Sequence, residues 1–309
     1  MIGIDVGGAN LKVVDREGAH IHYCPLWEGA PVAEVLASYA AEGDRKAAVV
    51  MSGELADSFR SKKEGIAFIV RAVQEAFPEA LFYGTDARFH TEPAPVLAAA
   101  NWLASADYLR EMYPDSVLVD VGSTTTDIIP LPSFSSLKGM TDLARLRKGY
   151  LVYTGMLRTS IPTLIRSVVL GGCEIPVSTE YFAASADAHL VLGHITPAMY
   201  TCDSPDKKEK TVQASLRRLA RVVCADIEEI GEGSAMQIAR EFWEVQRCIV
   251  CEAVDRAVRE SGSNDVIVAG IGAPLFAREL DGLDLTRELG PVADALPAYA
   301  VRELAERSR

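Results

Sequence analysis

The sequence has little of what marks a nucleic-acid-binding or membrane protein. Basic residues are in deficit, with 31 Lys and Arg against 43 Asp and Glu, so the net charge is −12. This balance argues against nucleic acid or an anionic membrane surface as a partner. The longest apolar stretch, residues 95–106, is shorter than the roughly 20 residues that span a bilayer. Because a strand pattern begins at Ile2, we expect no signal sequence and a cytoplasmic protein.

Metal-site and disulfide patterns are also missing. The chain has six cysteines and five histidines, but none stands at zinc-site spacing. Cys248 and Cys251 form a CxxC inside a helical pattern and lack a second pair, so we expect buried or half-buried free thiols. The 309 residues, 49% hydrophobic and 24% charged, predict a folded protein of about two domains.

Two stretches, Ile2–Val14 and Leu118–Leu131, share one pattern. Each is a hydrophobic strand that reaches an aspartate (Asp5 or Asp120), turns through glycine and continues as a second hydrophobic strand. A glycine turn exposes backbone N–H groups to an anion. A carboxylate beside it is suited to holding a divalent cation or accepting a proton. The two hairpins therefore predict a pair of loops that grip one polyphosphate between two lobes.

The turns supply specific candidates for this chemistry. The phosphate-binding candidates are backbone and hydroxyl donors and one amide: Gly7, Gly8, Asn10, Gly122, Ser123, Thr124, Thr125 and Thr126. Asp5, Asp120, Asp127 and Lys12 are the catalytic candidates, and Asp5 and Asp120 are candidate ligands of Mg²⁺ or Mn²⁺. Alternatives remain open: either aspartate could cap its own turn, and Lys12 could face solvent. Strand alternation lets at most half of the threonines face a ligand.

The remaining pattern alternates strands with helices. The expected elements are a strand–turn–strand at 2–14, a strand at 19–23, a helix at 32–39, a strand at 46–51, a helix at 65–76, a strand at 80–83, a helix at 95–109, a second strand–turn–strand from 116, helices at 211–230 and 235–260, a strand at 266–269 and a closing helix at 292–306. This order predicts mixed sheets with helical crossovers. We expect lobe I at 1–115, lobe II at 116–290 with an insertion at about 132–210, and the C-terminal helix within 291–309 packed back on lobe I.

Two further features have competing interpretations. The segment 266–280 runs from a strand through Gly270, Gly272 and Ala273 into a helix. These three residues are candidates for phosphate binding, because the turn could place the N-terminus of the helix near an anion or let an adenine ring lie against its glycines. A packing turn is the alternative. The basic residues of helix 211–230 recur opposite its apolar face, which favours a solvated surface; they are Arg217, Arg218 and Arg221.

The hairpin at Asp5, the hairpin at Asp120 and the segment 266–280 together resemble the phosphate-1, phosphate-2 and adenosine motifs of the actin, sugar kinase and Hsp70 superfamily. Other segments are similar to its hydantoinase A and 5-oxoprolinase branch, in the compact form found in tetrahydromethanopterin-linked C1 metabolism. They are Met51–Asp57 (MSGELAD), Ala100–Trp102, Gly149–Gly155, Arg158-Thr159 and Glu180–Phe182. The resemblance covers nearly the whole chain. It implies an α/β fold of two ribonuclease H-like lobes with an interlobe cleft, in which ATP or ADP could also bind.

The resemblance also implies a reaction. A Mg²⁺-dependent transferase would join an aminomethyl-furanmethyl diphosphate to the phenol oxygen of γ-glutamyltyramine, with release of pyrophosphate, in methanofuran biosynthesis. Its partners would be these two small molecules; the oligomeric state stays open. The substrate-binding candidates are Glu54, Thr85, Asp86, Tyr153, Thr154 and Arg158. Arg158 would pair with the glutamyl carboxylate or the diphosphate. The acceptor of the phenol proton is open among Asp5, Asp120, Asp127, Glu54 and Asp86.

Rival functions follow from the same motifs. The phosphate equipment would equally serve an ATP γ-phosphate, in a kinase or an amide-ring hydrolase. A nucleotide-gated scaffold without a small-molecule product is the non-enzymatic alternative. Ordinary explanations also exist for the substrate candidates, since Tyr153 and Thr154 could be core residues, Arg158 a surface cation, and Asp86 a helix cap.

Overall fold

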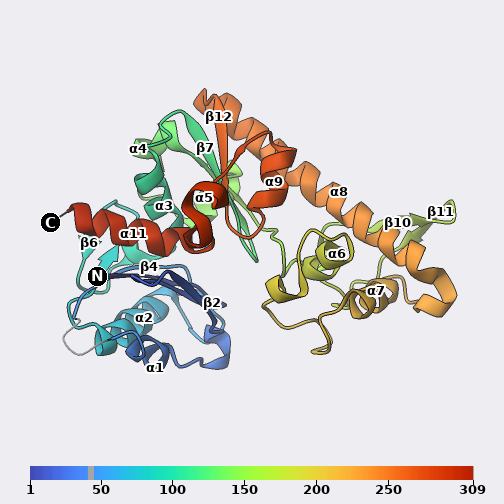
Figure 1. Ribbon diagram of the computed structural model, residues 1–309, viewed down its shortest axis with the longest axis horizontal. Coiled ribbons are helices and arrows are strands. Elements are labelled where there is room, and N and C mark those ends of the chain that lie inside the picture. The colour runs from blue at the N-terminus through green and yellow to red at the C-terminus, as the bar shows by residue number, and fades with distance from the viewer. Residues whose placement is uncertain (41–44, 309) are drawn as a thin grey trace.

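Two α/β lobes and a mostly helical extension make up the protein, as the computed structural model of residues 1–40 and 45–308 shows (Figure 1). The sheet of lobe I has the order β3-β2-β1-β4-β5-β6. Its strands are β1 (Ile2–Val6), β2 (Asn10–Val14), β3 (Ala19–Tyr23), β4 (Ala47–Met51), β5 (Leu81–Tyr83) and β6 (Phe89–His90). β1, β2 and β3 pair antiparallel, whereas β4 and β5 join in parallel. Three antiparallel strands followed by two parallel ones form a ribonuclease H-like sheet, which confirms the predicted fold class.

Both faces of this sheet are covered, so its central strands are apolar throughout. Every residue of β1 and of β4 is buried. Ala47, Val49 and Met51 pack with the helices α1 (Val32–Ala37) and α2 (Lys62–Ala76) on one face. The alternate residues of β4 join the core on the other face. Figure 1 shows α1 and α2 below the sheet, with α3 (Asn101–Leu109) and α11 (Leu296–Arg307) above it.

The helices on the second face come from distant parts of the chain. They are α3 (Asn101–Leu109) and α11 (Leu296–Arg307), which contact each other and β4. α11 also packs on β1, where a Cβ added at Gly3 would lie 1.9 Å from the carbonyl oxygen of Ala298. Only a glycine permits this approach of helix and strand.

Lobe II repeats the hairpin in a second sheet, of order β13-β12-β7-β8-β9. Its strands are β7 (Ser116–Val121), β8 (Thr126–Pro130), β9 (Leu151–Val152), β12 (Asp265–Ala269) and β13 (Leu283–Asp284). β7 pairs antiparallel with β8 and parallel with β12. One continuous core joins this sheet to α3 and α11, so the lobes share apolar packing.

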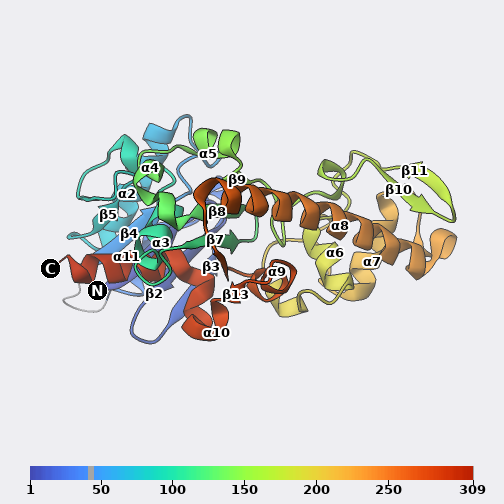
Figure 2. The same cartoon turned by 90° about the horizontal axis from the view of Figure 1, so that it is seen from above.

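The extension has a core of its own. Its elements are β10 (Ser167–Leu170), β11 (Cys173–Pro176), α6 (Ser185–Val191), α7 (Val212–Arg221) and the first half of α8 (Ile227–Ser261). α8 runs from the extension back to lobe II, which Figure 2 shows from above. A kink at Gly231, where φ is +75°, lies near its start.

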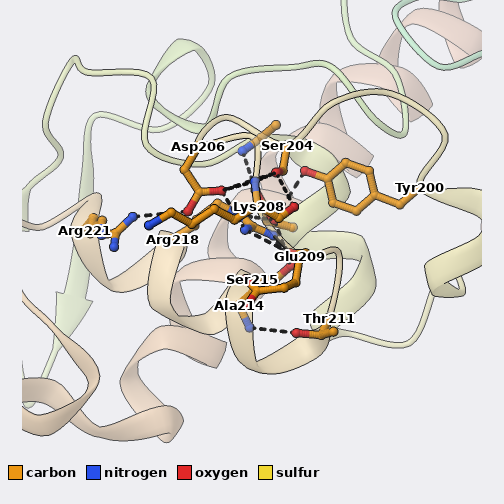
Figure 3. A network of polar contacts seen from close by, with 12 residues as sticks. Tyr200, Ser204, Asp206, Lys208, Glu209, Thr211, Ala214, Ser215, Arg218 and Arg221 are labelled. Atoms are coloured by element: carbon orange, nitrogen blue, oxygen red, sulfur yellow. Dashed lines mark hydrogen bonds and ion pairs between the residues drawn. The ribbon is translucent and has the colours of Figure 1, made fainter.

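A buried ion-pair network holds the extension together (Figure 3). Arg218 is 1% exposed, and its Nε donates to Asp187 Oδ1 at 2.8 Å. Its Nη1 donates to Asp206 Oδ1 at 3.0 Å, and both Nη atoms reach the carbonyl of Glu209 at 3.2 Å. The predicted solvated face is therefore wrong for Arg218, because the loop before α7 folds over it.

Several predicted elements differ from the structure. The helix expected at 95–109 begins only at Asn101, because Ala99 has a φ of +47° that interrupts the helix. The helix expected at 211–230 is broken, since Cys224 has a φ of +59° between α7 and α8. The expectation of buried or half-buried thiols is confirmed for Cys24, Cys202 and Cys251 and is wrong for the other three cysteines, which are exposed: Cys173, Cys224 and Cys248. No helix within residues 1–40 and 45–308 is both long and apolar enough to cross a membrane.

Candidate active site

The two aspartate–glycine hairpins close with the same hydrogen bond. Gly7 N–H donates to Asn10 O at 3.0 Å, and Gly122 N–H donates to Thr125 O at 2.9 Å. Both turns line one cleft between the lobes, with a volume of about 520 Å³. Its lining includes the acidic, basic and turn residues Asp5, Gly7, Gly8, Asn10, Lys12, Glu54, Asp120, Gly122, Ser123, Thr124, Thr125 and Asp127, and also Tyr153 and Arg158. The structure thus brings most of the candidate residues together.

The hairpins differ in the residue opposite each aspartate. Asp5 pairs across the strands with Lys12, whereas Asp120 pairs with Asp127. The extra carboxylate is neutralised by Arg145, which forms an ion pair with Asp127 and a second one with Asp142 at 3.0 Å. The cleft therefore has a cation beside each hairpin.

Burial dominates the electrostatics of the cleft floor. It raises the pKa of Asp5 to about 6, while the charge of Lys12 acts in the opposite direction. It raises the pKa of Asp120 to about 7; Lys12 opposes this shift, and Asp127 and Asp5 add to it. Burial also raises the pKa of Asp127 against the effect of Arg145. Carboxylates held this way favour a cation or a proton as their neighbour.

The side chains at the cleft floor could supply only part of the coordination shell of a divalent cation, and a bound ligand would have to supply the rest. Oδ1 of Asp5 is buried and has no hydrogen-bond partner among the described residues. Yet no three His, Cys, Asp or Glu side chains in those residues are grouped to hold a metal ion. Mg²⁺ commonly binds one or two carboxylates and completes its shell with substrate phosphates and water. Asp5 and Asp120 match that requirement.

Two predicted binding residues lie behind the cleft. The Thr126 hydroxyl is buried and donates to the carbonyl of Thr154 at 2.9 Å. The Thr154 hydroxyl accepts a bond from Gln246 Nε2 at 2.8 Å and contacts the Thr159 hydroxyl at 3.0 Å. The prediction that Thr126 and Thr154 contact a ligand is corrected, because their hydroxyl groups connect β8, the loop after β9 and α8.

The glycine turn after β12 is a packing turn. A Cβ added at Gly270, whose φ is +81°, would lie 2.4 Å from Asp120 Oδ1. Gly272 N–H donates to the carbonyl of Val121 at 3.0 Å, and Ala273 is fully buried. None of the three is part of the cleft lining, which corrects their prediction as phosphate-binding residues. They support β7 directly behind Asp120.

Thr85 and Asp86 are also outside the cleft lining. The Thr85 hydroxyl donates to the carbonyl of Val96 at 3.1 Å. The Asp86 carboxylate contacts His90 Nε2 at 3.1 Å. Both side chains thus stabilise the β5–β6 region, and Asp86 is removed from the candidates for the proton acceptor.

One contact across the cleft was not predicted from the sequence. Trp27 belongs to lobe I, in the 3₁₀ turn Leu26–Glu28. The Arg158 guanidinium, from lobe II, lies 4.7 Å from the centre of its ring. Tyr153, on the same loop as Arg158, is 69% exposed at the cleft. No local pattern identifies Trp27, because its partner is 131 positions away. The cleft mouth thus offers aromatic rings beside a guanidinium.

The loop that carries Tyr153 and Arg158 is held tightly against the second hairpin. A Cβ added at Gly155 would lie 2.7 Å from the carbonyl oxygen of Gly122 and 2.7 Å from backbone carbons of Ser123 and Thr124. Gln246 of α8 donates to the carbonyl of Gly155 at 3.0 Å. The positions of this loop and of the phosphate-binding turn are therefore coupled.

Comparisons of the sequence with known proteins match one family and two relatives of the same name. Residues 45–302 match the model of the family Hydantoinase/oxoprolinase. The (4-{4-[2-(gamma-L-glutamylamino)ethyl]phenoxymethyl}furan-2-yl)methanamine synthase of Methanocaldococcus jannaschii is 35% identical over 99% of this chain and 98% of its own length. A protein of the same name from Methanococcus vannielii is 34% identical over 57% of this chain and 80% of its own.

Solved structures that match the fold of this chain share little sequence identity with it. A ROK family glucokinase from Streptomyces griseus, in complex with glucose and AMPPNP, is 14% identical, with a TM-score of 0.42 over 99% of each chain. The activator of 2-hydroxyisocaproyl-CoA dehydratase from Clostridium difficile, with bound ADPNP, is 11% identical, with a TM-score of 0.44 over 100% of this chain and 96% of that one.

Proposed function

Because this chain belongs to the hydantoinase/oxoprolinase family, we propose that it uses the cleft of that fold to displace pyrophosphate from a furanmethyl diphosphate with a phenol. The substrates would be an aminomethyl-furanmethyl diphosphate and γ-glutamyltyramine, in the cytoplasmic synthesis of methanofuran. The observation that carries the proposal is the convergence of the two matched hairpins on one cleft, in a chain similar over nearly its full length to a synthase whose name specifies the product.

The bonds follow from the product named for that relative, a furan that carries a methanamine and a phenoxymethyl ether. The phenol oxygen forms a bond to the furanmethyl carbon. The bond from that carbon to the diphosphate oxygen breaks, and its electron pair leaves with pyrophosphate. The phenol proton passes to a carboxylate. Positive charge grows on the furanmethyl carbon while negative charge grows on the leaving group.

The residues at the hairpin turns act on the leaving group. Gly8, Ser123 and Thr124 line the cleft, and the backbone N–H of Gly8 and the two hydroxyls would donate to phosphate oxygens. Lys12 adds a positive charge. Asp5 and Asp120 are the residues that would hold Mg²⁺. When bound, this ion supplies positive charge that stabilises pyrophosphate as it departs.

A cleft carboxylate would take the phenol proton. Asp127 is already engaged in an ion pair with Arg145, so its carboxylate is less available to a substrate proton. Asp5, Asp120 and Glu54 therefore remain as proton acceptors. Arg158 at the mouth is a candidate for the glutamyl carboxylate, since a guanidinium forms paired hydrogen bonds with such a group.

Phosphorus NMR tests the reaction. Purified protein with Mg²⁺ and both substrates should release pyrophosphate, and mass spectrometry should detect the ether. Omitting γ-glutamyltyramine is the control and should abolish ether formation. Release of ADP and phosphate from ATP, with no pyrophosphate from the furan diphosphate, would instead establish a kinase or hydrolase. Tight ATP binding with lobe closure and no product would indicate a scaffold.

A further inference from the structure

Glu54 is a buried acid that the chemistry of the leaving group does not use. It follows β4 on the lobe I side of the cleft and is 2% exposed. Its Oε2 atom has no hydrogen-bond partner among the described residues. Its Oε1 atom lies 3.8 Å from Lys62 Nζ, which is beyond hydrogen-bond distance. The carboxylate lining the cleft is thus incompletely satisfied.

Such a group is unfavourable in the folded protein without a ligand. A buried carboxylate that lacks a partner has lost its hydration without gaining a replacement. Burial is the main cause that raises the pKa of Glu54. The backbone N–H groups of Glu54 and Ala99 and the charge of Lys62 oppose this shift, and Asp142 across the cleft adds to it. A ligand that brings a cation with N–H donors would satisfy the free oxygen and offset the loss of hydration.

Glu54 is electrostatically distinct from the floor of the cleft. The side chains that act most on Asp120 are Lys12, Asp127 and Asp5, whereas those that act on Glu54 are Lys62 and Asp142. A diphosphate beside Glu54 would be repelled, so the site suits the opposite end of a substrate. The furan substrate of the proposed reaction has a diphosphate at one end and a primary ammonium at the other.

We propose that Glu54 binds the ammonium group of the aminomethyl furan substrate and selects diphosphates that carry a primary amine. This inference rests on the proposed function. It deepens that function by assigning the recognition of one substrate group to one side chain. A site with a buried polar group discriminates strongly against an analogue that leaves the group unpaired. We therefore expect the protein to prefer the amine over the same furanmethyl diphosphate with a methyl group in place of aminomethyl.

A comparison of two substrates and two variants tests this role. Glu54→Gln removes the charge and retains the shape. Glu75→Gln is the matched control, because Glu75 is an exposed acid on α2 that does not line the cleft. kcat/KM for pyrophosphate release is measured with the aminomethyl and the methyl substrate. The wild type and Glu75→Gln should prefer the amine by at least about 100-fold. In Glu54→Gln this preference should fall to within about threefold, chiefly through loss on the amine.

Two results would overturn the assignment. One is an equal loss on both substrates in Glu54→Gln, which would indicate a structural role or a role as the acceptor of the phenol proton; the other is a retained preference for the amine. Thermal unfolding of each variant checks the fold, and Glu54→Gln should melt no lower than the wild type, since a buried and incompletely paired charge is removed.

A binding measurement separates this inference from the reaction itself. Furfurylamine, titrated calorimetrically with 2-methylfuran as the reference, should bind the wild type and Glu75→Gln at least tenfold more tightly than Glu54→Gln. If pyrophosphate release fails while this difference holds, the proposed reaction is wrong and the ammonium site stands. If furfurylamine binds no better than 2-methylfuran, the ammonium site is wrong.

Discussion

Asp120→Asn should move activity and stability in opposite directions. The substitution removes a carboxylate from the floor of the cleft but keeps its size. Turnover should fall at least about 100-fold, because a residue that holds a metal ion or accepts a proton is lost. The free energy of unfolding should rise, because the folded protein no longer contains this buried charge.

The size of the gain follows from the pKa of Asp120, raised from 3.8 to about 7 by burial. Each pKa unit corresponds to about 1.4 kcal/mol, so ionisation destabilises the folded protein by at most about 4 kcal/mol. The asparagine amide also loses hydration, and we expect a net gain of about 2 kcal/mol at pH 8. For a protein of this size, that corresponds to a rise in Tm of several degrees.

The effect of Asp120 on the free energy of unfolding depends on pH. The folded pKa lies above the unfolded one, so the protonated form favours folding, and this stabilisation is lost as pH rises from about 4 to about 7. The Tm difference between Asp120→Asn and the wild type should therefore widen from pH 4 to pH 8. Calorimetry with a chelator present measures it, with the exposed Asp255→Asn as control. Near-normal turnover, or a difference that narrows with pH, would refute the reasoning.

Three further predictions concern other sites. Arg218→Met leaves the buried Asp187 without its cation and should lower the free energy of unfolding by about 3–5 kcal/mol in urea titrations; adding Asp187→Asn should recover part of the loss, and additive losses would contradict the pairing. Gly155→Ala places a methyl group against the second hairpin and should lower kcat at least tenfold with a modest fall in Tm; unchanged kcat would show that the loop and turn are not coupled. Arg158→Gln should raise KM for γ-glutamyltyramine at least tenfold and leave KM for the diphosphate substrate unchanged; two-substrate kinetics decides, and the reverse pattern would place Arg158 on the diphosphate.

The hairpins were predictable because their geometry is local. An aspartate, a following glycine and flanking β-branched strands determine the turn without help from distant residues. Two such turns in one chain led to the prediction that both face one ligand, and both turns line the same cleft. Asp5 and Asp120 could be placed at that cleft from the sequence, whereas their roles stay predictions.

What the sequence did not reveal depends on distant contacts. Thr126 follows Thr124 and Thr125 in the sequence and was predicted, like them, to bind phosphate. Its hydroxyl instead donates a hydrogen bond to the carbonyl of Thr154. Arg218 lies on an amphipathic helix with a polar face, and only the loop folded over that face makes it buried. Trp27 becomes part of the cleft through Arg158 of the other lobe. Hydrophobic periodicity predicts the secondary structure to which a residue belongs, but it does not predict which other segments pack over that element.

The return of α11 to β1 has a consequence for biosynthesis. The ribosome makes β1 early and the helix that covers one of its faces some 290 residues later. At roughly 5–20 residues per second, translation leaves that face uncovered for on the order of tens of seconds. On the same face of the sheet, Ala48 and Val50 of the neighbouring strand β4 share a core with α11. These apolar residues lack that cover in the nascent chain, and a chaperone that binds such surfaces would act on this protein before α11 is released.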